Sequence, residues 1–361
     1  MTSSQPAWDI PPSWSPAVEA ARAGATLFLI GAIDSGKSTL AAILASAAVE
    51  AGRAAAVVDA DTGQSNLGPP TCVGMARVTH PIRRLEELSA EAIDFVGSSS
   101  PVGHLLNAAA SAQAMATAAR RLGAETIIVD TTGLVSGGVA RALKSAKVRL
   151  LDPDVVVAVQ AEDEVEHLLA PFAHRARPRV LRLRRSRRVK VRTREQRTAR
   201  RQGLFAAYFA GGRAAEVAWD QLPMENTAWT TGETAPGHIR AFAEERVECE
   251  VLHAELRADG LLLIVSGRPN AEGLRSLGAD FGGSARAIDA AALQHLLVGL
   301  LGERGETLGV GILEGVEFGS RRLRIFTPIS DLDKAKGVRL GAVRVARDGT
   351  ELGWNDPGDL G

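Results

Sequence analysis

The residues with the clearest chemical meaning form a glycine-rich loop near the N-terminus. The segment reads GAIDSGKST and matches the pattern G-x-x-x-x-G-K-S/T. In this pattern glycines let backbone N–H groups turn towards phosphate oxygens, and the N-terminus of the following helix adds a partial positive charge. We therefore predict a nucleotide-binding loop, and its residues are Gly31, Ala32, Ile33, Asp34, Ser35, Gly36, Lys37, Ser38 and Thr39.

Two residues of this loop have specific expected roles. Lys37 is expected to reach the β- and γ-phosphates of ATP, and Ser38 to ligate Mg²⁺. The alternative is a chance glycine-rich turn between a strand and a helix. An apolar strand directly before the motif and an alanine-rich helix directly after it favour the phosphate-binding reading. The motif predicts ATP and Mg²⁺ as cofactors but leaves the reaction open.

Three aspartates follow short apolar runs. Asp59 ends AAAVVD and Asp130 ends TIIVD, so either could be the Mg²⁺-associated carboxylate, and the sequence does not decide between them. Asp61 lies just beyond, in the loop DADTGQSNLGPP, at the strand end that faces the ligand crevice in open α/β sheets. There it can orient a hydroxyl and accept its proton, a contribution of roughly 10²–10⁴-fold. The alternative for Asp61 is an ordinary Asx-turn residue.

Arginine is concentrated between residues 174 and 201. This segment, HRARPRVLRLRRSRRVKVRTREQRTARR, contains a single acidic residue. Thr193 and Gln196 form a capping-box pattern, which predicts a helix over about 194–210. We interpret 185–210 as a lid whose arginines offset phosphoryl charge and hold a nucleic-acid backbone. The alternative is a solvated basic face or a flexible linker.

The block SSSPVGH, residues 98–104, precedes another predicted helix. Serine and glycine at a helix N-terminus can bind phosphate through backbone N–H groups. His104, the last residue of the block, is expected either to contact an acceptor strand or to serve as a polar cap.

These motifs lie between alternating apolar runs and helical segments. The predicted strands are residues 26–31, 54–59, 93–97, 126–130 and 154–160, and the predicted helices are 37–50, 105–122, 139–150 and 164–170. Continuous Val/Ile/Ala runs separated by helices are typical of strands buried on both faces. The sequence therefore predicts an α/β fold of the P-loop NTPase class, with a doubly wound, mostly parallel sheet.

The pattern changes after about residue 245. LRADGLLLIV (256–265) and VRVARDGTEL (343–352) each carry an Asp-Gly step between apolar segments, which indicates hairpins. We predict a smaller β-rich C-terminal domain. The predicted organisation is an N-terminal extension at 1–24, a P-loop domain at 25–244 with the lid at about 185–210, and the β-rich domain at 245–361.

The overall composition is that of an ordinary soluble protein. The 361 residues include 42 Lys and Arg against 42 Asp and Glu, so no global charge attracts a polyanion and only the local arginine stretch does. Two distant cysteines fit neither a disulfide framework nor a zinc site. Since no signal peptide or membrane-spanning run is evident, we expect a cytoplasmic location without a membrane partner.

Taken together, the motif blocks resemble the polynucleotide 5′-hydroxyl kinases of RNA processing. That family includes the kinase subunit of eukaryotic mRNA 3′-end processing, a nucleolar pre-rRNA kinase and prokaryotic relatives. The matching text covers most of residues 26–210: GAIDSGKST, DADTGQSNLGPPTCVGMA, FVGSSSPVGHLL, VDTTGLVSGGVARALK and RTREQRTARRQGLFAAYF. The resemblance implies transfer of the γ-phosphate of ATP to a nucleic acid, RNA or DNA, with a 5′-hydroxyl end.

The resemblance also implies roles for single residues. Catalytic roles fall on Lys37, Asp61, Arg192 and Arg197, of which the two arginines are similar to lid arginines that close over the γ-phosphate. Substrate contacts fall on Gln64, His104, Thr131, Thr132 and Gly133, of which the last three are similar to a "clasp" near the transferring phosphate. Metal contacts fall on Ser38, Asp59 and Asp130. Eukaryotic members have a base-stacking Trp directly after the clasp glycine, whereas this chain has Leu134.

Two other functions stay open at this point. One is an ATP-switched scaffold or assembly protein of nucleic-acid processing that transfers no phosphoryl group to a substrate. Such a switch has no need of Asp61 as a base. The other is a kinase for a small hydroxyl compound, which the long arginine stretch disfavours. Protein partners cannot be read from the sequence.

Overall fold

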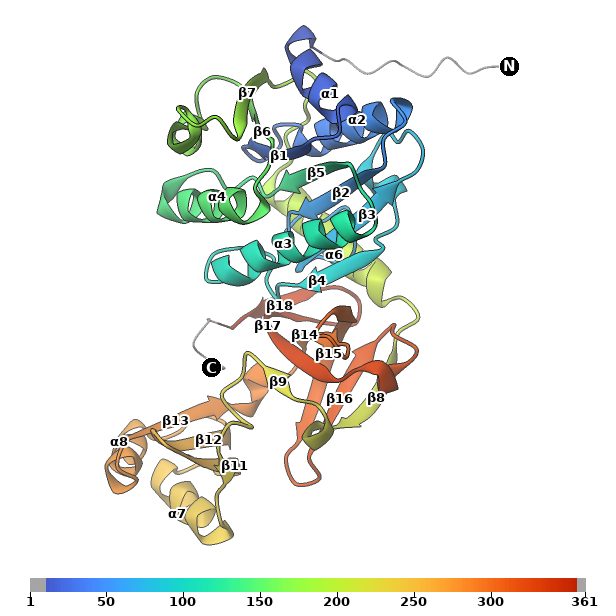
Figure 1. Cartoon of the computed structure of the whole chain (residues 1–361). Coiled ribbons are helices and arrows are strands. Elements are labelled where there is room, and N and C mark those ends of the chain that lie inside the picture. Colours follow the sequence, from blue (N-terminus) through green and yellow to red (C-terminus); the bar gives the residue numbers. More distant parts are fainter. Residues whose placement is uncertain (1–10, 356–361) are drawn as a thin grey trace. The chain divides into compact units, whose positions relative to one another are not determined.

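The computed structural model describes residues 11–355, and Figure 1 traces the chain. The chain divides into two compact units, one ending at Arg201 and the other beginning at Gln202. The domain boundary predicted at residue 245 lies within the second unit. Residues 1–10 of the predicted N-terminal extension, and the last six residues of the predicted β-rich domain, lie outside the described residues.

The first unit is built on a mixed, mostly parallel sheet with the order β4–β3–β2–β5–β1–β6–β7. Its strands are β1 (Thr26–Gly31), β2 (Ala55–Ala60), β3 (Cys72–Val78), β4 (Ala92–Phe95), β5 (Thr126–Thr131), β6 (Val155–Gln160) and β7 (Arg179–Arg184). Strands β2, β5, β1, β6 and β7 run parallel, while β3 pairs antiparallel with β2 and β4. The prediction of a mostly parallel α/β sheet is confirmed.

Helices cover both faces of this sheet. They are α1 (Ser15–Arg22), α2 (Lys37–Glu50), α3 (Leu105–Arg121), α4 (Gly137–Leu151) and α5 (Glu166–Leu169), with 3₁₀ turns at Pro12–Trp14, Leu85–Glu87 and Ala170–Phe172. A further helix, α6 (Arg194–Phe209), follows β7 and continues past Arg201. One apolar core joins α1 and α2 to the sheet, and a second joins α3 and α4 to it. Because the central strands are buried at every position, they need apolar residues on both faces.

The predicted strands and helices of this unit agree with the structure to within two residues. The capping box is also confirmed, because Thr193 N–H donates to Gln196 Oε1 (3.0 Å) and Gln196 N–H donates to Thr193 Oγ1 (3.2 Å), directly before α6. The first part of the arginine stretch, before the predicted lid at about 185–210, forms edge strand β7.

The second unit is rich in antiparallel strands, which confirms the β-rich C-terminal part of the predicted fold class, while the domain bounds 245–361 stay a prediction. One group pairs in the order β18–β17–β14–β15, with β16 on β15, β8 on β16 and β9 on β17, and a smaller sheet has the order β10–β11–β12–β13. The bounds are β8 (Arg213–Ala218), β9 (Met224–Glu225), β10 (Glu233–Thr234), β11 (Glu250–Arg257), β12 (Gly260–Ser266), β13 (Ser284–Asp289), β14 (Leu296–Leu301), β15 (Thr307–Glu317), β16 (Arg322–Thr327), β17 (Gly337–Val345) and β18 (Glu351–Trp354).

Both predicted hairpins are present in this unit, joining β11 to β12 and β17 to β18. The unit also holds two helices that the sequence did not predict, α7 (Gly237–Val247) and α8 (Ala271–Asp280). They pack on the smaller sheet and share its apolar core. Short 3₁₀ turns lie at Trp219–Gln221, Ala290–Leu293 and Leu332–Lys334.

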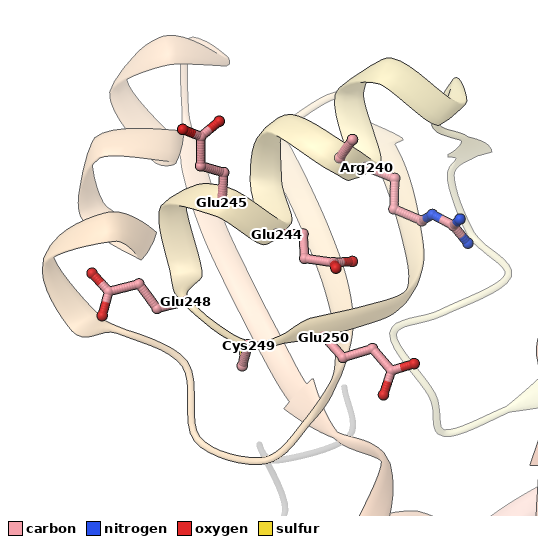
Figure 2. A pocket seen from close by; sticks show the side chains of 7 residues that line it. Arg240, Glu244, Glu245, Glu248, Cys249 and Glu250 are labelled. Carbon is pink, nitrogen blue, oxygen red and sulfur yellow. The ribbon is translucent and has the colours of Figure 1, made fainter.

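An open hollow of about 620 Å³ lies beside α7 (Figure 2). Its lining is acidic and consists of Arg240, Ala241, Glu244, Glu245, Glu248, Cys249 and Glu250. Four carboxylates against one arginine would repel a phosphate chain.

Within residues 11–355, no three His, Cys, Asp or Glu side chains are grouped as a metal site would require. No helix of this part of the chain is both long and apolar enough to cross a bilayer.

Candidate active site

The phosphate-binding loop lies where its motif predicts, between β1 and α2. A Cβ added at Gly31 would lie 2.5 Å from Ser35 Oγ and 2.6 Å from the carbonyl oxygen of Val159, so the turn leaves room only for glycine. Gly36 has a φ of +95°, a left-handed conformation that glycine adopts without a steric penalty. Helix α2 then begins at Lys37 and directs its N-terminus at the loop.

The ammonium of Lys37 lies against the backbone of its own loop. It donates hydrogen bonds to the carbonyl oxygens of Gly31 (2.9 Å) and Ala32 (2.8 Å). Burial lowers the pKa of Lys37, and the nearby carboxylates of Asp130, Asp61 and Asp34 partly offset this effect. An incoming phosphate would therefore compete with carbonyl oxygens for a cation that is already held at the loop.

Ser38 and Asp130 form a direct pair beside this lysine. Ser38 Oγ donates to Asp130 Oδ2 at 2.5 Å, and Thr131 N–H donates to Asp130 Oδ1 at 2.9 Å. Asp130 is buried at the end of β5, and this burial raises its pKa, while Lys37 and Ser38 act in the opposite direction. The parallel pairing of β1 and β5 thus brings a hydroxyl and a carboxylate together, the oxygen donors that Mg²⁺ prefers.

Asp59 organises the loop that follows β2. Its Oδ1 accepts the N–H of Asp61 (3.1 Å), and its Oδ2 accepts the N–H groups of Asn66 (2.5 Å) and Leu67 (3.2 Å). Burial, reinforced by the negative charges of Asp130 and Asp61, raises the pKa of Asp59 to about 8. Both carboxylate oxygens are therefore engaged by the protein backbone.

Asp61 forms the Asx turn that was the alternative reading of the sequence. Its Oδ1 accepts the N–H groups of Gly63 and Gln64, both at 3.1 Å. None of the hydrogen bonds within residues 11–355 involves Oδ2, and the residue is only half-buried. The turn therefore fixes one oxygen and leaves the other available, so the turn and the role of a base are compatible.

Gln64 joins this loop to the lid. Its Nε2 donates to the carbonyl oxygens of Gly63 (3.0 Å) and Arg197 (3.1 Å). A Cβ added at Gly63 would lie 2.7 Å from the carbonyl oxygen of Ser99, so the loop also packs directly on the segment before α3. The substrate contact predicted for Gln64 stays a prediction.

The lid lies on the phosphate-binding loop. Arg192 N–H donates to Asp34 Oδ2 at 2.9 Å, and the Arg197 guanidinium lies 3.5 Å from the same oxygen. Val189 Cγ2 would lie 3.3 Å from a Cβ added at Gly36. The structure thus brings together the loop and both arginines that the sequence selected.

The segment after β5 packs on the same loop with no side chain between the two backbones. A Cβ added at Gly133 would lie 2.5 Å from Ile33 Cγ1 and 2.6 Å from both the nitrogen and the Cα of Ile33. Thr131 Oγ1 donates to the carbonyl oxygen of Leu29 at 2.7 Å. The predicted clasp residues therefore lie beside the loop, and their place near the transferring phosphate stays a prediction.

Two buried lysines that the sequence reading missed support this segment. Lys144 Nζ donates to Thr131 Oγ1 (2.6 Å) and to the carbonyl oxygen of Thr132 (2.7 Å), and Lys147 Nζ donates to that of Ala60 (3.4 Å). Burial lowers the pKa of Lys144 well below its usual value, and lowers that of Lys147 to about 8. Their spacing along α4, in phase with its buried apolar positions, is the signal that could have identified them.

Arg200 is a third residue that the sequence did not single out. Its Nη1 donates to the carbonyl oxygen of Gln64 (3.1 Å), and its Nη2 donates to Asn66 Oδ1 (2.9 Å) and Glu86 Oε1 (3.1 Å). These hydrogen bonds join α6 to the loop that carries Asp61.

His104 stands directly before α3, as expected for the block 98–104. Its side chain makes no capping hydrogen bond, and burial lowers its pKa. Contact of His104 with an acceptor strand stays a prediction.

A glycine-rich loop, a hydroxyl–carboxylate pair and a basic lid, set at the carboxyl edge of a parallel sheet, define a P-loop nucleotide-binding protein of the phosphotransferase type. Comparison with known proteins agrees. Residues 31–211 match the family described as mRNA cleavage and polyadenylation factor CLP1 P-loop. The chain belongs to this Clp1-type family of polyribonucleotide 5′-hydroxyl kinases, so the resemblance seen in the sequence is confirmed.

Archaeal relatives match nearly the whole chain. A polyribonucleotide 5′-hydroxyl-kinase of Thermococcus kodakarensis is 32% identical over 337 residues, covering 91% of this chain and 90% of the relative. One of Pyrococcus horikoshii is 30% identical over 333 residues, covering 92% and 89%. Among solved structures, Clp1p in a wild-type Clp1p–Pcf11p complex superposes with a TM-score of 0.59 at 13% identity, over 92% of this chain and 78% of that chain, which shows a shared fold.

Proposed function

We propose that this protein transfers the γ-phosphate of ATP to the 5′-hydroxyl end of a polyribonucleotide. The observation that carries the proposal is Asp61, whose Asx turn near Lys37 engages Oδ1 while Oδ2 enters no hydrogen bond with any residue of 11–355. A protein that only binds nucleotide has no use for such a carboxylate. The names of its archaeal relatives, similar over about nine tenths of the chain, support the same substrate class.

In this reaction the 5′-oxygen attacks the γ-phosphorus while the bond from that phosphorus to the β–γ bridging oxygen breaks, and ADP leaves. The proton of the hydroxyl passes to Asp61 Oδ2. Because phosphoryl transfer has a loose transition state, Asp61 acts mainly by orienting the hydroxyl and accepting a proton that leaves late. Lys37 and the N-terminus of α2 hold the negatively charged phosphates.

The residues present fit a magnesium ion. Ser38 and Asp130 already form a hydroxyl–carboxylate pair at the phosphate-binding loop, and Mg²⁺ commonly takes one or two protein oxygens together with substrate phosphates and water. We propose that these two residues hold the ion, which when bound neutralises phosphate charge. We assign Asp59 to shaping the Asp61 loop, since backbone N–H groups engage both of its oxygens.

The lid and the clasp complete the proposed site. Arg192 and Arg197 would close over the γ-phosphate, and arginines used in this way contribute about 10³–10⁵-fold in related reactions. Thr131–Gly133 would border the transferring phosphate. Gln64 and His104 would lie on the acceptor side. The other exposed arginines of the lid would contact the phosphates of the RNA backbone, and they are Arg185, Arg187, Arg188 and Arg194.

The decisive experiment follows labelled γ-phosphate from ATP to short 5′-hydroxyl RNA and DNA oligonucleotides. Lys37→Ala and Asp61→Asn should each abolish most of the transfer, while Asp61→Asn should still bind ATP. The matched controls are Lys336→Ala and Asp220→Asn, which alter exposed residues of the second unit. Transfer to RNA that Asp61→Asn leaves unchanged would refute the assignment. ATP binding without transfer in the unaltered protein would favour a nucleotide-switched scaffold instead.

A further inference from the structure

Both lid arginines converge on one carboxylate of the phosphate-binding loop. Asp34 has a φ of +53°, and its side chain is 9% exposed. Its Oδ2 accepts the N–H of Arg192 at 2.9 Å and lies 3.5 Å from Arg197 Nη1, while its Oδ1 lies 3.8 Å from Arg192 Nη1. A single loop residue therefore binds the lid through one backbone donor and two guanidinium groups.

Three further contacts hold the lid in this docked position. Arg197 Nη1 donates to the carbonyl oxygen of Arg192 at 2.5 Å, which joins the two arginines to each other. Gln64 Nε2 holds the carbonyl oxygen of Arg197, and Val189 packs over Gly36. All of these contacts join groups of the chain itself.

The charge of Asp34 is unexpected at this position. A phosphate-binding loop works by presenting backbone N–H groups, and an uncompensated carboxylate on it would repel the anion it must bind. In the structure the two arginines offset this charge. A γ-phosphate carries more charge and more acceptor oxygens than a carboxylate, so it competes favourably for the same guanidinium groups.

We propose that Asp34 is a positioning residue for the lid, whose carboxylate holds Arg192 and Arg197 over the phosphate-binding loop before ATP binds and releases them to the γ-phosphate afterwards. The proposal deepens the proposed function and rests on it for the identity of the phosphate donor. Docking stabilises the free enzyme but not the ATP complex. It therefore lowers the affinity for ATP and keeps the arginines ordered close to their place of action.

Asp34→Asn tests this directly. Asparagine adopts the left-handed conformation at least as readily as aspartate, so the loop keeps its shape while the charge is removed. The first measurement is the rate at which trypsin cleaves after the arginines and lysine of residues 185–194, with no nucleotide present. We expect Asp34→Asn to be cut about three- to tenfold faster than the unaltered protein, the range for loss of a charge-assisted contact that is partly open to solvent.

When Mg²⁺ and ATP are added, trypsin should cleave both proteins at the same reduced rate, because the γ-phosphate then binds the lid arginines in place of the Asp34 carboxylate. In steady-state kinetics, KM for ATP should fall by a similar three- to tenfold factor with kcat nearly unchanged, since docking affects only the free enzyme. A merely structural role of Asp34 would instead lower kcat together with the melting temperature. Equal cleavage rates in the two nucleotide-free proteins would overturn the proposal.

Two further variants keep the test decisive. Glu86→Gln is the matched control, because Glu86 is a second carboxylate that binds α6, in this case through Arg200. In this variant Arg200 keeps its hydrogen bonds to Gln64 and Asn66. Cleavage of Glu86→Gln at 185–194 should rise far less than that of Asp34→Asn, because an exposed ion pair contributes little. If Asp34→Asn does not fold, Arg197→Met breaks the same contact from the lid side and should accelerate cleavage equally; cleavage at the unaltered rate would overturn the proposal. Because cleavage without nucleotide needs no catalysis, a protein that lacks kinase activity can still confirm or refute the docking.

Discussion

Arg200 offers a prediction that can be worked from the structure. Its guanidinium forms three hydrogen bonds from α6, two of them to the loop that carries Asp61 and one to Glu86. The Arg200 side chain is 20% exposed and that of Glu86 is 47% exposed. Replacing Arg200 by Met keeps most of the apolar stem and removes the three bonds.

The magnitude follows from the exposure of each partner. A hydrogen bond to a charged group contributes about 1.5–3 kcal/mol, and we take the low end for the two loop contacts because Arg200 is not fully buried. The exposed pair with Glu86 adds only about 0.2–1 kcal/mol. These contributions add up to roughly 3–4 kcal/mol. At ~1.4 kcal/mol per factor of ten, their loss in Arg200→Met lowers the ratio of docked to undocked α6 by about 10²–10³-fold.

Two assays test this value. We expect kcat/KM for RNA to fall about 10²-fold in Arg200→Met, and backbone amides of α6 to exchange hydrogen faster by a comparable factor. Arg121→Met, which removes an exposed arginine of α3, is the matched control and should change neither quantity. Unchanged exchange in α6 would show that the other contacts of the lid hold the helix without Arg200, and would refute the contribution assigned to this residue.

Two other predictions concern charge. Arg197→Ala should lower the single-turnover rate by about 10³-fold or more and ATP affinity much less, since arginines of this kind act on the transition state; equal rates in a rapid-quench experiment would contradict the lid assignment. Lys147, with a pKa of about 8, binds fewer protons when folded than when unfolded (~10.4), so stability should rise between pH 8 and 10. Urea unfolding should show this rise, as much as ~3 kcal/mol, in the unaltered protein relative to Lys147→Met. Asp59, whose pKa is also raised to about 8, makes stability fall with pH mainly below this window, and it is present in both proteins that are compared. A difference that stays constant across the window would argue against the burial of Lys147.

The sequence predicted the parts of the molecule that depend on local patterns. The loop Gly31–Thr39, the helix after it and the capping box at Thr193 each depend on residues close together in the chain, so spacing alone identifies them. The parallel sheet was predictable for a related reason, since strands buried on both faces must be apolar throughout. Residues 179–184, rich in arginine, were not recognised as strand β7, because an edge strand has no need of an apolar pattern on both faces.

The contacts that join distant segments could not be read from spacing. Lys144 and Lys147 look like solvated helix residues until the packing of α4 against the sheet buries them. Arg200 resembles every other arginine of its stretch, and only the folded chain shows that it binds Gln64 and Asn66. Asp34 was predicted as part of the nucleotide site, but its partners lie about 160 residues further along the chain.

The contact between Gly133 and Ile33 has a mechanical consequence. Most segments of a protein touch through side chains, whose rotamers can change and absorb a small displacement. Here two backbones touch directly, with no room for even a methyl group. A shift of the nucleotide loop must therefore move the segment after β5 by nearly the same amount, so this pair should behave as one stiff body through the reaction cycle.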